Sequence, residues 1–407
     1  MEEFKKERTF HDAWAFILYV ILTLTTSVTL VKISSGIPFD ASIILPGLSV
    51  NVGIMLFMLT LIYLGFRYAA DGLIFTVHVF VPIIVLIASI LTENLTVIFI
   101  SAALTCVSLL FYFWSIKPVL PLMTVSIQTG AKIISGNLFK CILLIMLSVF
   151  IIIFQGVVFT GVVGQGADGA VTLSVILFIL NNTWTFFNIM YLVQTIVSGL
   201  VIGHLVDGEG SFAEASRNGL MALGSISFAG LVISIITTAK MIVQRNMDRN
   251  RESGSGNILN AIVLVILSSL ETLINTANEL AFPYLALHGT NYRDSMSGAF
   301  NLIQEKQGIT LLTNIAMERV VMFCCIQFVC VLIYGDLLLF KALSIDKISD
   351  SMLTTIAAIG IPVIVFTYNF LSVFSSSTLA LIYTYIESPL MVEKAEPEFA
   401  QAMESAK

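Results

Sequence analysis

Carboxylates and amides recur at helical spacing in an otherwise apolar part of the sequence. Glu271, Asn275, Asn278 and Glu279 stand at i, i+4, i+7 and i+8, which places all four on one face of a helix. An acidic side chain at the centre of a bilayer costs about 2.5 to 3.5 kcal/mol, so it needs a partner, a cavity or a proton there. Two readings stay open. Either this face only bonds neighbouring helices, or it attracts a cation or exchanges a proton.

A second polar face precedes the first in the chain and combines amides with aromatic rings. Asn181, Thr185 and Asn188 repeat at i, i+4 and i+7, and Trp184 and Tyr191 lie on the adjoining face. A quaternary ammonium ion has no N–H to donate, so its recognition depends on aromatic faces, worth about 2 kcal/mol or more when desolvated. The two rings therefore suit an organic cation. The alternative is that Trp184 fills a helix interface.

The composition indicates which kind of element must position these residues. The chain has 407 residues, of which 57% are hydrophobic and 11% are charged, and its mean hydropathy is +0.96. Soluble domains carry about 25% charged residues, so an ordinary soluble protein is excluded. The formal charge is −6, and the basic residues form no continuous face that could follow a phosphate backbone, so we expect no nucleic-acid partner.

The apolar residues gather in stretches long enough to cross a bilayer as helices, which takes about 20 residues. We therefore predict an all-α, polytopic membrane protein with about ten transmembrane helices. A double crossing within 172–205 would make the number about eleven. The predicted stretches are 13–33, 49–67, 71–91, 94–114, 141–163, 172–205, 219–243, 258–285, 311–335 and 354–385.

The remaining segments complete the expected organisation. Residues 1–12 form a cytosolic N-terminal segment, 13–391 a single transmembrane domain, and 392–407 a cytosolic polar tail. Residues 117–140 and 291–310 have the mixed composition of interfacial helices. The distribution of Lys and Arg places the N-terminus in the cytosol. The cysteines have no disulfide or metal spacing, and we expect neither metal nor cofactor.

Several blocks of the second half resemble the choline transporter-like family, including its fungal Pns-type members. The strongest is Leu270-Glu271 followed by the run Asn278-Glu279-Leu280-Ala281-Phe282-Pro283-Tyr284, where the family has Tyr in place of Phe282. Three further blocks agree in order, namely Trp184-Thr185 with Val197-Ser198-Gly199, the segment 223–230, and Glu387-Ser388-Pro389. The resemblance covers roughly residues 170 to 400 and implies about ten membrane helices with both termini cytosolic.

The resemblance implies a plasma-membrane transporter of choline or a related, ethanolamine-like cation, with coupling to protons left open. On this hypothesis Trp184 and Tyr191 cage the cationic head, Glu271 supplies counter-charge or exchanges a proton, and Asn181, Asn188 and Asn278 orient the hydroxyl, with Asn275 and Glu279 on the same face. The site would lie near the bilayer midplane between stretches 172–205, 258–285 and 354–385.

Other functions stay open beside this one. The sequence has none of the motifs expected of the common enzyme classes, so we expect no enzymatic activity. A non-transporting membrane scaffold or a lipid-handling protein is the main alternative, and a channel is the third. Membrane lipids are the expected surroundings, and the sequence does not indicate an oligomeric state.

Overall fold

The chain is almost entirely helical where its structure is described. A computed structural model describes residues 8–33, 41–90, 95–147, 151, 173–252, 258–306, 309–342 and 350–405. None of these residues forms a strand, and helices cover nearly all of them. The predicted all-α polytopic fold is thereby confirmed. By contacts between Cα atoms the chain separates into two compact units.

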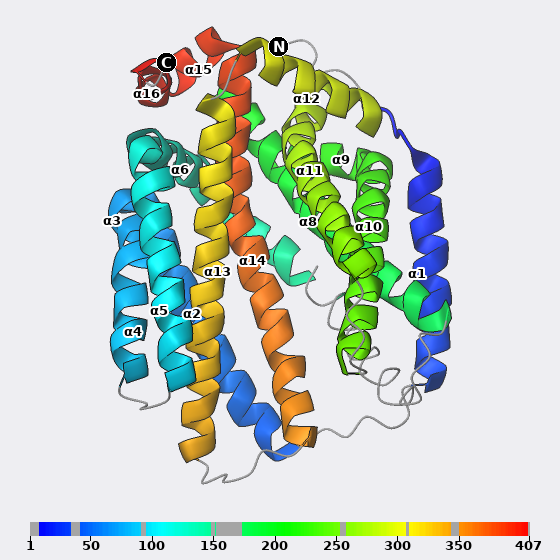
Figure 1. Ribbon diagram of the computed structural model, residues 1–407. Helices are drawn as coiled ribbons and strands as arrows, with labels where there is room; N and C mark the ends of the chain where they lie inside the picture. The colour runs from blue at the N-terminus through cyan, green and yellow to red at the C-terminus, as the bar shows by residue number, and fades with distance from the viewer. Residues whose placement is uncertain are drawn as a thin grey trace. The chain divides into compact units, whose positions relative to one another are not determined.

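Unit 1 comprises Met1–Pro38, Leu143–Leu200 and Ser211–Leu302. Within it α10 and α11 run side by side, and α1 packs against α10 (Figure 1). Its helices are α1 (Ala13–Ile33), the first part of α8 (Leu173–Asp207), α9 (Phe212–Met221), α10 (Leu223–Glu252), α11 (Ile258–His288) and most of α12 (Tyr292–Lys306).

Unit 2 comprises Phe39–Ile142, Val201–Gly210 and Ile303–Lys407. Its long helices α2, α13 and α14 pack against one another, and α6 packs on α2 and α14. Its elements are α2 (Ala41–Tyr68), α3 (Ala70–Phe75), the π-helix η1 (Thr76–Phe80), α4 (Val81–Ile90), α5 (Leu95–Phe111), the π-helix η2 (Tyr112–Ile116), the 3₁₀-helix η3 (Lys117–Val119), α6 (Leu120–Ser135), α13 (Ile309–Ala342), α14 (Asp350–Glu387), α15 (Pro389–Ala395) and α16 (Pro397–Ser405).

Wherever the predicted apolar stretches are described, they fall on helices. Among the described residues, seven helices are long and apolar enough to cross a membrane, and three shorter apolar helices, Ala13–Thr26, Leu138–Leu147 and Val320–Ile333, match the other three stretches. The helix α8 is one unbroken element, so the stretch 172–205 does not turn back on itself. This favours ten crossings over eleven.

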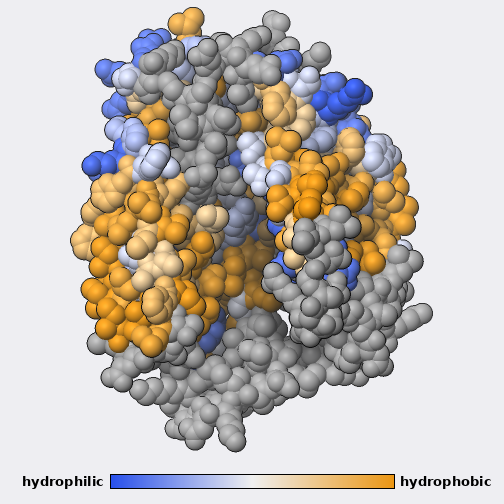
Figure 2. Space-filling view, viewed as in Figure 1, coloured by the Kyte–Doolittle hydropathy of each residue, from blue (hydrophilic) through white to orange (hydrophobic). Residues whose placement is uncertain are grey.

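The surface of the helices matches a lipid environment. In Figure 2 orange, hydrophobic atoms cover the flank of unit 2 formed by α3, α4 and α5. On α5 the exposed side chains include Phe99, Leu104, Val107 and Leu110. Exposed apolar areas of this extent are rare on monomeric soluble proteins, so this flank is suited to lipid chains.

A proline lies inside the membrane segment that runs through α3, η1 and α4, and neighbouring helices compensate for it. Pro82 has no N–H to donate to the preceding turn. The carbonyl of Val77 instead accepts a hydrogen bond from Gln327 Nε2, and the carbonyl of His78 accepts one from Ser108 Oγ at 2.8 Å. These bonds link the π-helix η1 to α5 and α13, and they satisfy polar groups that lipid could not.

The residues expected as a polar tail form the end of α15 and the whole of α16, and they pack on α6 within unit 2. Phe399, Ala400 and Met403 of α16 are buried. Between the two helices, Glu396 binds Lys132 Nζ at 3.0 Å and His204 Nε2 at 3.3 Å. A buried apolar face and a shared carboxylate therefore dock this segment onto unit 2.

Candidate functional site

The indole of Trp184 lies between three helices of unit 1. The side chain projects from α8 and is 1% exposed. Its Nε1 donates a hydrogen bond to the backbone oxygen of Ser227 on α10 at 2.8 Å. The ring of Tyr19 on α1 meets it edge to face, with 5.4 Å between the ring centroids. The indole therefore has its polar atom satisfied and an aromatic neighbour in contact.

Asn188 stands one helical turn after Trp184, on the same side of α8, and faces Gly230 of α10. A methyl group at Gly230 would overlap the Asn188 amide and would lie 3.0 Å from Trp184 Cδ1. Only glycine leaves room for both side chains here. Asn188 is buried, and neither its Oδ1 nor its Nδ2 has a hydrogen-bond partner among the described residues. The amide thus keeps its full capacity to bind another polar group.

Asn181 ties α8 to α1 at the other end of this polar face. Its Oδ1 accepts a hydrogen bond from Thr23 Oγ1 at 2.9 Å. One turn later, Thr185 Oγ1 accepts a bond from the hydroxyl of Tyr19 at 3.1 Å and itself donates to the Asn181 carbonyl. Four side chains from two helices therefore form one connected set, and α1 is held against α8 by polar contacts.

Tyr191 is the centre of a second set that joins α8, α11 and α12. Its hydroxyl accepts a hydrogen bond from Asn278 Nδ2 at 2.8 Å and lies 3.4 Å from Asn275 Oδ1. Asn278 Oδ1 in turn accepts a bond from the hydroxyl of Tyr292. Burial raises the pKa of Tyr292 to about 12, so the phenol stays protonated and acts as a donor. Phe282 packs against the Tyr191 ring at 4.5 Å.

The same helix carries a proline that leaves a carbonyl without its usual donor. Pro283 lies inside α11, and the carbonyl of Glu279 is four residues before it. Gln194 of α8 donates its Nε2 hydrogen to this oxygen at 3.4 Å. The Glu279 position thus contributes a backbone group to the contact between α8 and α11.

Glu271 makes an ion pair with α10. Its Oε2 lies 2.5 Å from Lys240 Nζ, and its Oε1 accepts a hydrogen bond from Thr237 at 2.8 Å. Trp184 binds α10 at Ser227, ten positions before Thr237, which is about 15 Å along a helix at 1.5 Å per residue. The carboxylate and the indole therefore use different parts of α10.

The N-terminal segment crosses the end of this bundle. The Arg8 guanidinium donates to the carbonyls of Leu285, Ala286 and Leu287, at 3.1, 2.7 and 3.0 Å. These carbonyls belong to the last turn of α11, where a cation is favoured by the helix dipole. Gly289 follows at φ +65°, a conformation that suits glycine at a helix end, and its missing side chain gives Arg8 its place.

Asp12 holds the other end of the same segment. Its Oδ2 accepts a hydrogen bond from Ser225 Oγ at 2.7 Å and another from the backbone N–H of Tyr292 at 3.1 Å. The carboxylate thereby caps the first turn of α12 and binds the first turn of α10. Residues 8–12, which we call the N-terminal strap, connect α10, α11 and α12.

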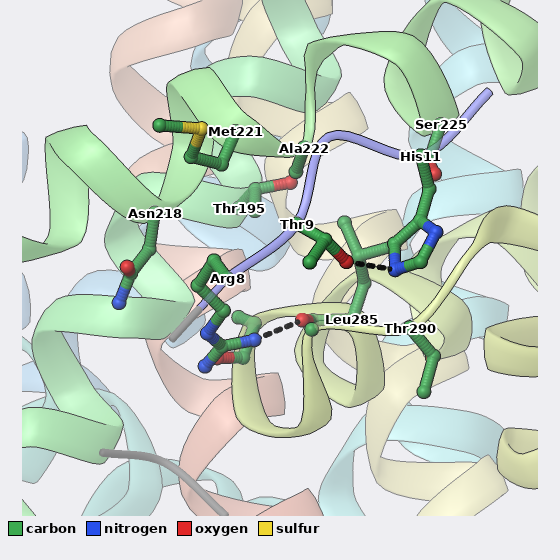
Figure 3. A pocket seen from close by; sticks show the side chains of 12 residues that line it. Arg8, Thr9, His11, Thr195, Asn218, Met221, Ala222, Ser225, Leu285 and Thr290 are labelled. Atoms are coloured by element: carbon green, nitrogen blue, oxygen red, sulfur yellow. Dashed lines mark hydrogen bonds between the residues drawn. The ribbon is translucent and has the colours of Figure 1, made fainter. Parts of the chain in front are cut away.

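A narrow cleft lies beneath the strap (Figure 3). The cleft is small and partly open to solvent. Thr195 of α8 lines it, and Leu285 and Ala222 belong both to its wall and to the apolar cluster around Tyr191. Its lining residues are Arg8, Thr9, His11, Thr195, Asn218, Met221, Ala222, Ser225, Leu285, Ala286, Gly289 and Thr290. The strap therefore covers the side of the bundle nearest the Tyr191 set.

The structure sorts the predicted site residues into three groups. Trp184 and Asn188 share one surface against α10, while Asn181 faces α1. One hydrogen-bonded set contains Tyr191, Asn275 and Asn278. Glu279 directly follows Asn278 on α11. Glu271 pairs elsewhere with Lys240. The stretch 354–385 corresponds to α14 of unit 2, and its expected part in the site stays a prediction.

Sequence reasoning missed several partners of these residues. Thr23 and Lys240 each form a hydrogen bond with a predicted site residue, and the ring of Tyr19 packs on Trp184. Lys240 follows the apolar core of its stretch and resembled a loop residue, although its spacing of three from Thr237 puts both on one face. Arg8 and Asp12 belong to a short charged segment in which no periodicity indicates a contact. The contacts of Arg8 and Asp12 could be found only from the structure.

These observations define the class of the chain: a polytopic, all-helical membrane protein whose unit 1 buries amides and aromatic rings between its helices. The chain belongs to the plasma-membrane choline transporter family, whose sequence model matches residues 54–389.

Curated relatives are similar over shorter ranges. A CTL-like protein of Dictyostelium discoideum is 26% identical over 232 residues, which is 54% of this chain and 40% of the relative. Protein PNS1 of Cryptococcus neoformans is 26% identical over 102 residues, 24% of this chain and 18% of the relative. Protein PNS1 of Yarrowia lipolytica is 32% identical over 95 residues, 23% of this chain and 16% of the relative. The chain thus spans less than half the length of these relatives.

Proposed function

We propose that this protein transports choline or a related small organic cation across the plasma membrane, and that the face of α8 with Trp184, Asn188 and Tyr191 binds the substrate. The family description names choline, and the two aromatic rings provide what a quaternary ammonium ion requires. A hydroxyl group on the same substrate needs a polar partner within a few ångströms of the rings.

Asn188 is the observation that supports this proposal best. Buried amides almost always have hydrogen-bond partners, and leaving one unpaired costs about 1 to 3 kcal/mol. The amide of Asn188 has none among the described residues, and it lies beside Trp184 at Gly230. A ligand hydroxyl that accepts from Nδ2 or donates to Oδ1 would remove this cost, while the cationic head meets the indole.

The other predicted residues take supporting parts in the proposal. Asn275 and Asn278 hold the hydroxyl of Tyr191 and so orient its ring toward the substrate face. Asn181 keeps α1 against α8. Glu279 contributes its backbone oxygen to the contact between α8 and α11. Since these groups are already bonded, Asn188 replaces them as the group that orients the hydroxyl.

Glu271 has a conditional part in this scheme. Its charge is balanced by Lys240 in this structure, so it acts as counter-charge or exchanges a proton only when that pair separates. In the proposed cycle α1 and α10 shift away from α8, since Tyr19 and Gly230 now pack against the indole and its neighbour. Substrate then enters between the separated helices, in the alternating manner common to transporters.

Uptake of labelled choline into proteoliposomes tests this function. The purified protein should give saturable accumulation that responds to the imposed gradient. Absence of accumulation would favour a scaffold or lipid-handling protein, and a flux that stays linear in choline concentration would indicate a channel. Ethanolamine as a competitor then tests how far the site depends on the quaternary head.

The variant Trp184→Leu tests whether the indole binds the substrate. Loss of a desolvated cation–π contact of about 2 kcal/mol should reduce the apparent affinity about 30-fold. The matched control is Trp114→Leu, because Trp114 is 84% exposed on the outer surface of η2. If the Trp184 variant lost expression and uptake in equal proportion, the indole would belong to folding and not to binding.

A further inference from the structure

A carboxylate that the sequence pattern did not single out lies within unit 2. Asp336 is on α13, in the last part of a helix that begins at Ile309. Its Oδ1 accepts a hydrogen bond from Nδ2 of Asn51 on α2 at 2.8 Å. Gly335 allows this close approach, because a methyl group there would collide with the end of the Ile54 side chain on α2.

Asn51 is almost completely enclosed, with 1% of its surface exposed. Its two amide hydrogens are both used, since Nδ2 also donates to the carbonyl of Gly47 at 2.9 Å. Its Oδ1 has no donor among the described residues. A buried amide oxygen without a donor costs about 1 to 3 kcal/mol, so a donor to Asn51 Oδ1 would stabilise this contact.

No cation pairs with Asp336 in the described part of the chain. The elements packed on α13 are α2, α6, α14, η1 and η3. Lys132 of α6 is bound to Glu396, and His78 of η1 packs on Phe323, about three and a half turns of α13 before Asp336. The other titratable residues of these elements are Tyr63, Arg67, Tyr68, Lys117, Tyr368, Tyr383, Tyr385 and Glu387. The described hydrogen bond of Asp336 is the one from Asn51.

Four charged residues of α13 and α14, namely Glu318, Arg319, Lys341 and Asp350, have side chains outside the described residues. Lys341 follows Asp336 by five positions, which places it about 140° round the helix from that carboxylate. An ionised Asp336 without a partner would leave a half-buried charge unbalanced, which costs free energy.

We propose that Asp336 and Asn51 form a proton-binding site. A proton taken from water resides on Oδ2 of Asp336, and the resulting O–H donates to Oδ1 of Asn51 while Asn51 Nδ2 continues to donate to Asp336 Oδ1. The acid and the amide then form a closed pair with two hydrogen bonds. This arrangement satisfies the remaining oxygen of Asn51 and removes the charge of Asp336 in one step.

Release of the proton reverses both effects. Without the proton, Asp336 Oδ2 and Asn51 Oδ1 would be two acceptors with no hydrogen between them. The pair would also carry one negative charge. Such a state needs water or a shift of α13 against α2. The site therefore responds to the movement of these helices, and its existence does not depend on the proposed substrate.

Difference infrared spectroscopy of the purified full-length protein tests the site. Raising the pH should bleach a carboxylic-acid C=O band that Asp336→Asn lacks, because asparagine keeps the shape and both hydrogen bonds but holds no titrating proton. Asp248→Asn changes an exposed aspartate and should keep the band. An unchanged bleach in Asp336→Asn, or no bleach in the wild-type protein, would overturn the proposal.

The partner residue gives a second test. Asn51→Leu removes both hydrogen bonds of the pair, and the midpoint of the bleach should rise by about one pH unit, because the lost bond to the charged carboxylate is stronger than the lost bond from the neutral acid. An unmoved midpoint would show that Asn51 takes no part. If the proposed transport function also holds, uptake by Asp336→Asn should lose its response to an imposed pH gradient while choline binding persists. Absence of uptake in the wild-type protein would contradict the transport function and leave the infrared result standing.

Discussion

Removing the guanidinium of Arg8 should detach the N-terminal strap from α11. Arg8 donates three hydrogen bonds to the carbonyls of Leu285, Ala286 and Leu287. Burial lowers the pKa of Arg8, and the Glu214 carboxylate opposes that shift, so the group is a partly desolvated cation. Hydrogen bonds from charged groups contribute about 1.5 to 3 kcal/mol each when buried. Since solvent reaches part of this side chain, we expect about 2 kcal/mol for the set.

Hydrogen exchange measures this loss locally. A change of about 2 kcal/mol raises the population of the open strap about 30-fold, and amide exchange in residues 8–12 and in the first turn of α12 should accelerate by the same factor. The variant is Arg8→Met, which keeps an apolar stem of similar reach. The first turn of α12 is included because Asp12 accepts from the backbone N–H of Tyr292.

The control for this prediction is Arg67→Met, which removes an arginine at the end of α2 in unit 2. It should leave exchange of the strap unchanged. Exchange in the strap that stayed at the wild-type rate in Arg8→Met would refute the reasoning. Faster exchange throughout unit 1 would also refute it, since that result would mean that Arg8 stabilises the whole bundle and not the strap.

Three further predictions concern stability. Gly230→Ala should lower the thermal unfolding midpoint, because the added methyl overlaps Asn188, and overpacking costs about 1 to 3 kcal/mol. Gln194→Leu should cost about 1 kcal/mol in urea unfolding, and Pro283→Ala should remove that cost by restoring the missing N–H donor in α11. Burial alone would raise the pKa of Glu396, but hydrogen bonds from His204 and Lys132 outweigh it and hold the pKa below its ordinary 4.5. The docking of α16 should therefore be fully stable above about pH 4.5 and weaken as the pH falls through the lower, folded-state pKa, as read from hydrogen exchange in α16.

Each of these has a matched control. Gly53→Ala adds a methyl in α2 where nothing lies within 4 Å and should not destabilise the protein. Pro283→Ala in the wild-type background separates its own effect from its rescue of the glutamine variant. Glu393→Gln alters an exposed carboxylate of α15 and should keep the pH dependence that Glu396→Gln loses. Equal behaviour of the two glutamate variants would contradict the docking role of Glu396.

The helices could be predicted from the sequence because apolar length is a strong signal. About 20 apolar residues cross a bilayer only as a helix, since every backbone group must be bonded internally. The ends of the helices were less predictable. The short segments α15 and α16 are too polar on average to resemble packed helices, and it is the period of Val392, Phe399 and Met403 that buries one side of them.

The sequence predicted which helix face each site residue lies on, but not which residues of other helices it binds. Helical spacing identified Asn275, Asn278 and Tyr191 as residues directed into the protein, and the structure joins them in one set. The same reasoning grouped Glu271 with Trp184, although they bind α10 about 15 Å apart. Periodicity fixes the direction in which a side chain points on its own helix, but it does not fix the relative height of two helices. For that, the contacts with α10 were needed.

Equilibrium binding of labelled choline to the purified protein tests the central claim most directly. Asn188→Ala should weaken binding about tenfold, the effect of one hydrogen bond to the substrate hydroxyl of about 1.4 kcal/mol. Asn182→Ala removes an amide from the same helix that is bonded to the Phe178 carbonyl, and it should bind choline as the wild-type protein does. Equal affinity in all three proteins would contradict the assignment of this face of α8 to the substrate.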